Sequence, residues 1–456
     1  MGWRRAVTIL APLVALAAAQ SAQASLPVLV IEGAGDGHGV GMSQVGAEGL
    51  ALHGYSASQI LSHYYMGTSL GRIAGGRLVT VLLQSGLRSV VFSGASRAGT
   101  RRLDPALIYI AKGSTHGRIT LESAHGRPLA RLAAPLHLSG PAPLSLDGAA
   151  LSGVINGRYR GSLEVTESAR RLTVVNRVGF ESYLKGVVPA ESPASWPAAE
   201  LQAQAIAARS YAVTSTPQHG FDLYGDTRSQ QYGGYNAETT ATNAAVSATL
   251  GRVVTYAGKS ITTFYFASSG GETESVQDAF AGAAPEPYLT AVLDPFDTSR
   301  FGPVSMPLRT AQRKLRGIVR GRLESILVTK RGMSPRVLTA DVVGSRGSAT
   351  VSGDTLAAAL GLQSTWDCFS VTTDTARLAA DWARACARPT HVRGAAPPGD
   401  TSGGGAVAPS GATGATAATG QTGATAATGP GGGAIESGGS TLPIGSTGGG
   451  VPGPGG

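Results

Sequence analysis

The chain has 456 residues, of which 42% are apolar, 14% are charged and 6% are aromatic, and it contains 65 glycines and 25 prolines. Ordinary domains carry about 25% charged residues and about 7% glycine, so this composition excludes a single, uniformly packed globule. The net charge of +9 favours an anionic environment, but basic residues form no long run and are not interleaved with aromatic ones, which argues against nucleic acid as a partner.

Residues 1–24 are expected to be a signal peptide. Arg4 and Arg5 precede an apolar stretch from 6 to 19, and Ala22–Ala24 has small residues at both ends, which suits cleavage before Ser25. A retained membrane anchor is the alternative, although the apolar stretch is shorter than the roughly 20 residues of a spanning helix. We therefore expect a secreted protein that contacts no membrane after signal removal.

Glycine occupies every second position from Gly33 to Gly41, which permits unusual backbone angles and a close approach of a ligand. No frame of this run supplies the G-x-G-x-x-G pattern of a dinucleotide loop, so phosphate binding is not expected there. His38, Ser43 and Gln44 are candidates for lining a polar site. The alternative for His38 is a turn residue that only satisfies backbone hydrogen bonds.

Strands and helices alternate irregularly after this run, which predicts an α+β fold. Runs rich in Val, Ile, Thr and aromatic residues predict strands at 78–83, 89–92, 107–110, 172–175, 252–256, 261–266 and 336–343. Three helices are expected: from a capping box of Ser56 and Gln59 to about residue 65, from Pro197 to about residue 213, and over 354–360. The small residues of the second helix imply close packing against another element.

A single carboxylate, Glu191, lies between a short expected helix and the long one that starts at Pro197. Pro189 and Pro193 restrict the backbone on both sides, and Trp196 is close in sequence. Such a carboxyl group could lie in a partly apolar cleft that raises its pKa, as a general acid requires. The alternative is an ordinary surface residue or a charge at a helix end.

Two further segments place small polar side chains beside glycine at the end of a β-like run. They are DTRSQQYGG at 226–234, with Gln230 and Tyr232, and FYFASSGGETE at 264–274, with Ser269 and Gly270. These side chains suit the recognition of sugar hydroxyls, although loops of this composition are common. The histidines show no zinc spacing and Ser269 does not match G-x-S-x-G, so we expect no metal and no cofactor.

The C-terminal part contains the two cysteines and a low-complexity tail. Cys368 and Cys386 predict a disulfide in an exported protein, with two free thiols as the alternative. From about Gly394 the apolar periodicity is lost and the unit GATAATG appears twice. A disordered tail over 391–456 is therefore expected, either a solvated spacer or a stalk that is glycosylated or threads the wall.

These segments together resemble the stage II sporulation protein D and LytB amidase-enhancer (SpoIID/LytB) family of cell-wall proteins. The motifs YLKGVVPAE, PASWP, LQAQA, AARSY, QQYGG and SSGGET carry the resemblance over about 174–289, and it continues to Trp366. GHGVGMSQ at 37–44 also resembles the family, in which it is expected after the LGL segment found here at 360–362. Because it comes first in this chain, we expect a circularly rearranged domain whose site is built from both ends of the ordered region.

The expected division follows from this resemblance. Residues 25–71 would complete a SpoIID-like core at 161–390, and 72–160 would be a β-rich insert or accessory domain. Some family members have a His and two Cys near the positions of 219–229, whereas this chain keeps His219 without the cysteines, so no zinc is predicted. The arginine often expected before LGL is also missing, which leaves the role of that surface open.

The resemblance implies lytic cleavage of peptidoglycan glycan strands, stripped of their stem peptides, by a lone glutamate at the position of Glu191. Arg209 would contact a muramic carboxylate, with a salt bridge inside the domain as the alternative. The glycan would be bound or oriented by the residues singled out above: His38, Ser43, Gln44, Gln230, Tyr232, Ser269 and Gly270. A rival function is a non-catalytic glycan-binding enhancer of a cell-wall amidase, and a third is a purely structural wall protein.

Overall fold

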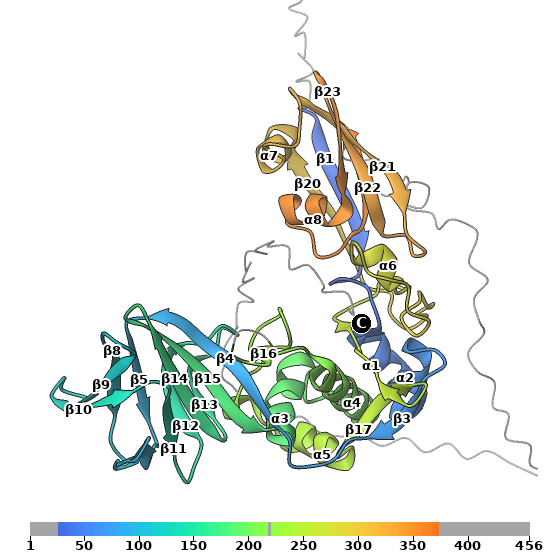
Figure 1. The fold of residues 1–456 in the computed structure, drawn as a ribbon. Coiled ribbons are helices and arrows are strands. Elements are labelled where there is room, and N and C mark those ends of the chain that lie inside the picture. Colours follow the sequence, from blue (N-terminus) through green and yellow to red (C-terminus); the bar gives the residue numbers. More distant parts are fainter. Residues whose placement is uncertain (1–25, 218–219, 374–456) are drawn as a thin grey trace, which may run out of the picture.

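The computed structural model describes residues 26–217 and 220–373. The expected signal peptide and tail, His219 and Cys386 lie outside the described residues. The described part is a strand-rich α+β structure, as the sequence predicts. Figure 1 shows three regions, which we call the two-sheet region, the central region and the C-terminal lobe.

The two-sheet region consists of two largely antiparallel sheets that share one apolar core. One sheet has the strand order β10-β9-β8-β5-β12-β13, and the other has β16-β4-β15-β14-β11-β6-β7. The strands are β4 (Leu78–Leu87), β5 (Ser89–Ser93), β6 (Arg97–Ala98), β7 (Arg101–Arg102), β8 (Tyr109–Gly113), β9 (Arg118–Ser123), β10 (Pro128–Ala133), β11 (Leu136–Ser139), β12 (Leu144–Ala149), β13 (Ile155–Tyr159), β14 (Ser162–Ser168), β15 (Arg171–Gly179) and β16 (Leu223–Tyr224). The expected division at residue 160 falls inside this region, between β13 and β14.

The central region surrounds one helix, α4 (Ala198–Thr214). Ala203, Ala205, Ala207 and Ala208 of α4 are fully buried, and these small side chains let four other helices approach it closely, as the sequence predicts. The remaining elements of this region are α1 (Gln44–Leu52), α2 (Ala57–Tyr64), α3 (Phe180–Glu191), α5 (Thr240–Ala248), α6 (Val276–Ala279), the 3-10 turn Tyr235–Ala237, and the strands β2 (Met42–Ser43), β3 (Ser69–Arg72), β17 (Arg252–Tyr256), β18 (Lys259–Ser260) and β19 (Tyr265–Phe266).

The C-terminal lobe joins the first and the last described strands in one sheet, of order β20-β1-β24. A second sheet, of order β21-β22-β23, and two helices complete its core. Its elements are β1 (Val28–Ala34), β20 (Arg300–Pro307), α7 (Leu308–Lys314), β21 (Leu323–Arg331), β22 (Val337–Gly344), β23 (Gly347–Ser352), α8 (Gly353–Leu360) and β24 (Trp366–Thr372). The start of the chain therefore folds together with the end of its described part.

The predicted helices are confirmed, while two strand predictions need correction. Ser56 and Gln59 form the capping box that begins α2, and α4 and α8 begin within one residue of the expected positions. The expected strand at 261–266 is reduced to the two residues of β19, and Leu107 and Ile108 lie in an exposed turn before β8. No helix among the described residues combines the length and the apolar character that crossing a bilayer requires.

Candidate functional site

Glu191 is the last residue of α3, at the point where the chain turns into α4. The helix ends at Ser192, which leaves the helical backbone conformation while its N–H still donates to the Val188 carbonyl at 2.9 Å. The Ser192 hydroxyl donates to the buried carboxyl group of Glu200, in the first turn of α4, at 2.8 Å. Both helices therefore fix the position of Glu191.

The Glu191 carboxylate accepts hydrogen bonds from two segments that are distant in sequence. Its Oε1 atom accepts the backbone N–H of Gln231 at 2.7 Å and the Tyr265 hydroxyl at 3.3 Å. The Gln44 side chain, at the start of α1, lies close enough to this carboxylate to lower its pKa, and its Nε2 atom donates to Gln204 at 3.5 Å. Glu191 thus lies where α3, the loop around Gln231, strand β19 and the N-terminal helix α1 meet.

The loop that carries Gln231 lies directly on α3 because residue 186 has no side chain. The Gly233 N–H donates to the Gly186 carbonyl at 2.9 Å. A Cβ atom at Gly186 would lie 2.6 Å from the Tyr232 ring, so a larger residue would push the loop away from the helix. The glycine of the YLKGVVPAE segment therefore sets the distance between Glu191 and its amide donor.

Burial raises the pKa of Glu191, and the hydrogen bonds from Gln231, Tyr265 and Gln44 oppose that rise without cancelling it. The residue as a whole is partly exposed at the protein surface. A carboxyl group that holds its proton more strongly than usual and is accessible from outside can donate that proton to a bound molecule.

Buried hydroxyl and amide groups continue from Glu191 into the protein. The Tyr265 hydroxyl accepts from Nε2 of Gln230 at 2.8 Å, and Oε1 of Gln230 accepts from the Tyr183 hydroxyl at 2.9 Å. Burial and then nearby charge, including that of Glu191, raise the pKa values of Tyr265 and Tyr183. Both phenols therefore remain protonated and act as neutral donors beside the carboxylate.

The N-terminal glycine-rich block packs against the segment that carries Tyr265. Strand β2 pairs in parallel with β19, so that Met42 lies beside Tyr265 and Ser43 beside Phe266. Ser43 caps α1, and its hydroxyl donates to Asp297 at 2.8 Å. Since Gln44 follows Ser43, the contact with Asp297 also holds Gln44 toward Glu191.

Asp294 and Asp297 form a buried acidic pair beneath this junction. Asp294 accepts the hydroxyls of Tyr64 and Ser269, each at 2.9 Å, and burial raises its pKa to about 7. Burial would raise the pKa of Asp297 as well. The hydrogen bonds that Asp297 accepts, the one from Ser43 above all, outweigh this effect, so its pKa is lowered. The negative charge of the pair therefore resides on Asp297, where hydroxyl donors surround it.

His38 does not hydrogen-bond to Glu191. Its ring lies 5.3 to 6.0 Å from the rings of Phe264, Phe266 and Phe280, and it hydrogen-bonds to the backbone of Tyr265. Desolvation by these rings and the charge of Arg336 lower the pKa of His38, although part of the side chain reaches solvent. The Val40 N–H also donates to Nδ1 of His38 at 3.1 Å, so the interpretation of His38 as a turn residue that hydrogen-bonds to backbone fits this geometry.

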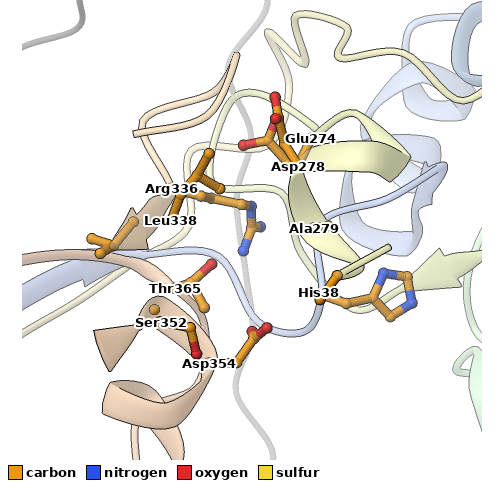
Figure 2. Close-up of a pocket in the computed structure, with 12 residues that line it drawn as sticks. His38, Glu274, Asp278, Ala279, Arg336, Leu338, Ser352, Asp354 and Thr365 are labelled. Atoms are coloured by element: carbon orange, nitrogen blue, oxygen red, sulfur yellow. The ribbon is translucent and has the colours of Figure 1, made fainter. Parts of the chain in front are cut away.

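His38 instead lies at the edge of a separate cavity of about 120 Å³ between the central region and the C-terminal lobe (Figure 2). The fully buried Arg336 crosses this boundary. Its guanidinium donates to the carbonyls of Gly37 at 3.0 Å and Ser269 at 3.4 Å. A Cβ atom at Gly39 would lie 2.4 Å from its Nε atom, so glycine is required there for Arg336 to reach both loops.

Six of the side chains expected to contact the glycan are buried inside the protein: Ser43, Gln44, Arg209, Gln230, Tyr232 and Ser269. Arg209 is fully buried and pairs with Glu181 at 2.7 Å, which is the alternative that the sequence left open. Tyr232 is also buried and donates to Asn176, while Ser43 and Ser269 bind the acidic pair. These side chains can orient the site, but they cannot touch a bound strand.

Gln230 and Gly270 have indirect or backbone roles as well. Gln230 is buried and reaches Glu191 only through Tyr265. Gly270 has φ near +75°, and a Cβ atom there would lie 2.6 Å from Ala34, so its role is a close backbone approach. The pairing of Cys368 with Cys386 stays a prediction because Cys386 lies outside the described residues.

Sequence reasoning missed several residues at this site. Tyr265 and Gln231 lie in motifs that were recognised, but the side chains and atoms that contact Glu191 were not identified. Glu200 was overlooked, although a carboxylate in the first turn of a helix that follows Trp-Pro is a visible feature. It is fully buried, and burial raises its pKa to about 8. No sequence pattern marks Asp294 or Asp297 as functional, since both lie in a segment without a motif.

Comparisons with known proteins point to one family. Residues 168–256, from β14 through α3, α4 and α5 to β17, match the family model described as Stage II sporulation protein. The chain is 37% identical over 195 residues to the amidase enhancer of Bacillus subtilis, covering 41% of this chain and 26% of that protein. It is 29% identical over 214 residues to stage II sporulation protein D of Bacillus amyloliquefaciens, covering 42% of this chain and 60% of the relative.

A further relative is an uncharacterized protein of Brachyspira hyodysenteriae, 36% identical over 150 residues, with 32% of this chain and 39% of the relative covered. The chain thus spans 26% to 60% of the length of these three relatives. The matched segment includes Glu191 and its helix, whereas Tyr265 and the N-terminal block lie outside the residues matched by the family model. These matches confirm that the segment carrying Glu191 resembles the SpoIID/LytB family.

Proposed function

We propose that the protein is an exported cell-wall enzyme that cleaves peptidoglycan glycan strands as a lytic transglycosylase, with Glu191 as its single acid and base. The observation that carries the proposal is the environment of this carboxyl group: burial raises its pKa in a residue that is still partly exposed. Among the described residues, its hydrogen-bond partners are a backbone amide, a phenol and a side-chain amide, not a second carboxylate.

A lone carboxyl group is sufficient for this reaction. The protonated Glu191 donates its proton to the glycosidic oxygen, the bond from C1 to that oxygen breaks, and positive charge develops on the sugar ring. The ionised Glu191 then removes the proton of the 6-hydroxyl of the same muramic residue, and O6 bonds to C1 to give a 1,6-anhydro end. No water is consumed, so the second carboxylate that hydrolysis usually employs is not required.

The surrounding residues support both states of Glu191. Burial favours the protonated acid, and the donors Gln231 and Tyr265 stabilise the carboxylate that forms after proton transfer. Gln44 comes from the N-terminal block, so in this proposal a circularly rearranged domain completes the site from both ends of the ordered chain. The charge of +9 would favour encounter with the muramic carboxylates of peptide-stripped strands.

The alternative is a glycan-binding protein that stimulates a separate amidase without cleaving the strand itself. The observation that favours it is the 37% identity to a relative named amidase enhancer. The buried network around Glu191 could serve this role as well, if its purpose is to shape a binding surface. The two functions differ in whether a new chain end is produced.

The test is incubation of the purified protein with peptide-stripped glycan strands, followed by mass spectrometry for 1,6-anhydro-muramic ends. We expect product from the native protein and a fall of at least about 100-fold in Glu191→Gln, which keeps the shape but cannot exchange the proton. Glu324→Gln, an exposed carboxylate of the C-terminal lobe, is the matched control and should retain activity. Strand binding without product in the native protein would support the enhancer instead.

A further inference from the structure

One segment of the C-terminal lobe is strongly basic. Residues 308–346 contain ten Lys or Arg residues, opposed only by Glu324 and Asp341, so this segment has a net charge of +8. Residues 78–179 of the two-sheet region also have a net charge of +8, with 13 Lys or Arg residues against five Asp or Glu, so the lobe segment is one of two basic parts of the chain. The proposed reaction at Glu191, in the central region, uses none of these residues.

Five arginines of this segment line one groove of about 850 Å³, which we call the arginine groove. Its apolar lining includes Leu26, Pro27, Leu308, Val319 and Leu323, and its arginines are Arg309, Arg313, Arg316, Arg322 and Arg346. All five arginine side chains are exposed, and none of them forms an ion pair with another described residue. Glu324 is the one acidic residue among the described groove residues.

The backbone around the groove is fixed without a ligand. The N–H of Arg346 donates to the Arg320 carbonyl at 3.1 Å, and the N–H of Ser345 donates to the Arg322 carbonyl at 2.8 Å. The Ser345 hydroxyl accepts the Arg322 N–H at 2.9 Å. These bonds hold the β22–β23 turn against the loop after α7, so the arginines of both segments face one concave surface.

We propose that the arginine groove binds a linear cell-wall polymer whose repeating charges are phosphodiesters. A guanidinium group presents paired N–H donors that match two oxygens of one phosphate, and several such groups along a groove match a repeating anion. None of the described residues that line the groove is aromatic, so they offer neither a sugar ring nor a nucleic-acid base a surface on which to stack. The concave shape also does not fit a flat bilayer.

The test measures binding of poly(glycerol phosphate) to the full chain by calorimetry at 50 and 200 mM salt. We expect binding that weakens with salt, and a loss of at least about 10-fold in the triple variant Arg309→Gln, Arg313→Gln, Arg316→Gln. The matched control is Arg97→Gln, Arg101→Gln, Arg102→Gln, which removes the same charge from exposed positions of the two-sheet region. That control should bind within about twofold of the native protein.

Three outcomes would overturn the proposal: no binding by the native protein, an equal loss in the control, or a triple variant that binds as the native protein does. Peptide-stripped glycan strands and phosphatidylglycerol vesicles are run in parallel. If either of these binds through the groove arginines while poly(glycerol phosphate) does not, the assignment to a phosphodiester polymer is wrong. Glu191→Gln should bind poly(glycerol phosphate) normally, which separates this site from the proposed reaction.

Discussion

At the scale of single residues, Tyr265 connects the parts of the candidate site. Its hydroxyl donates to Glu191 and accepts from Gln230, while its backbone contacts His38 on the other side of the strand. A donor to a carboxylate stabilises the ionised form and therefore lowers the pKa of that group. Tyr265 thus lowers the proton affinity of Glu191, against the effect of burial.

Tyr265→Phe should consequently raise the pKa of Glu191 further. If Glu191 is the acid, the pH at which activity declines on the alkaline side should move upward, because the group stays protonated to a higher pH. We expect kcat to fall about 10-fold near neutral pH, since the carboxylate formed after proton transfer loses a donor. The measurement is a pH profile of anhydro-end release.

Tyr256→Phe is the control for this experiment, because Tyr256 stacks on Tyr288, with ring centroids 5.2 Å apart, on another part of the central region. Its pH profile should match that of the native protein. An unchanged profile in Tyr265→Phe would show that this phenol does not act on the reacting carboxyl group.

At the scale of elements, the junction of α3 and α4 contains a second buried carboxyl group. Glu200 accepts the Ser192 hydroxyl, and burial raises its pKa from 4.5 to about 8. In the folded protein this group therefore holds its proton between about pH 4.5 and 8, whereas in the unfolded chain it releases it. The folded state binds more protons in this window, so the free energy of unfolding decreases as pH rises through it.

Glu200→Gln should remove this contribution while keeping an oxygen that accepts from Ser192. We expect the variant and the native protein to have similar unfolding free energies at pH 5, and the variant to be more stable by at least about 1 kcal/mol at pH 8. Urea unfolding at the two pH values measures the difference. Glu324→Gln, an exposed control, should show no such change, and a Glu200→Gln variant that is equally destabilised at both values would contradict the prediction.

Local sequence signals predicted elements better than they predicted the site. The capping box of Ser56 and Gln59 and the small residues of α4 act within a few turns of helix, so their consequences could be read along the chain. Glu191 was found because two prolines and a family motif mark it. Its partners could not be identified in this way, since Gln231 and Tyr265 are 40 and 74 positions away and Gln44 belongs to the other end of the ordered chain.

The predicted glycan contacts show the same limit. Small polar residues beside glycine suit sugar recognition, but they suit buried loop junctions equally well. Ser43 and Ser269 are buried because Asp294 and Asp297 offer acceptors beneath them, and these acceptors lie in a segment without any local signal. The same holds for Arg209, whose carboxylate partner Glu181 lies one helix earlier in the chain.

At the scale of the whole molecule, residues 26–72 are integrated with the rest of the described chain through two separate cores. Strand β1 is paired on both sides in the C-terminal lobe, and α1 and α2 pack on α4 in the central region. The link to the two-sheet region runs through Gly75 and Gly76, which are exposed. A Cβ atom at either glycine would meet nothing within 4 Å.

A protease site inserted between Gly75 and Gly76 should therefore be cleavable without loss of structure. We expect the two fragments to co-elute in gel filtration after cutting and to separate only in denaturant, because the buried strands and helices hold them together. Unchanged anhydro-end release after cutting would accompany this result. Fragments that separate in buffer would show that the N-terminal part depends on its covalent connection.

The pairing of Val28 with Thr372 brings the two ends of the described chain side by side. If the two ends were joined covalently at that point, the backbone would form a closed ring. If that ring were opened at Gly75, the resulting linear chain would carry the glycine-rich block at its end. Gene rearrangement can exchange these orders while every contact of Glu191 is kept. For this chain, the pairing of the strands therefore describes the architecture more fully than the order of the motifs along the sequence.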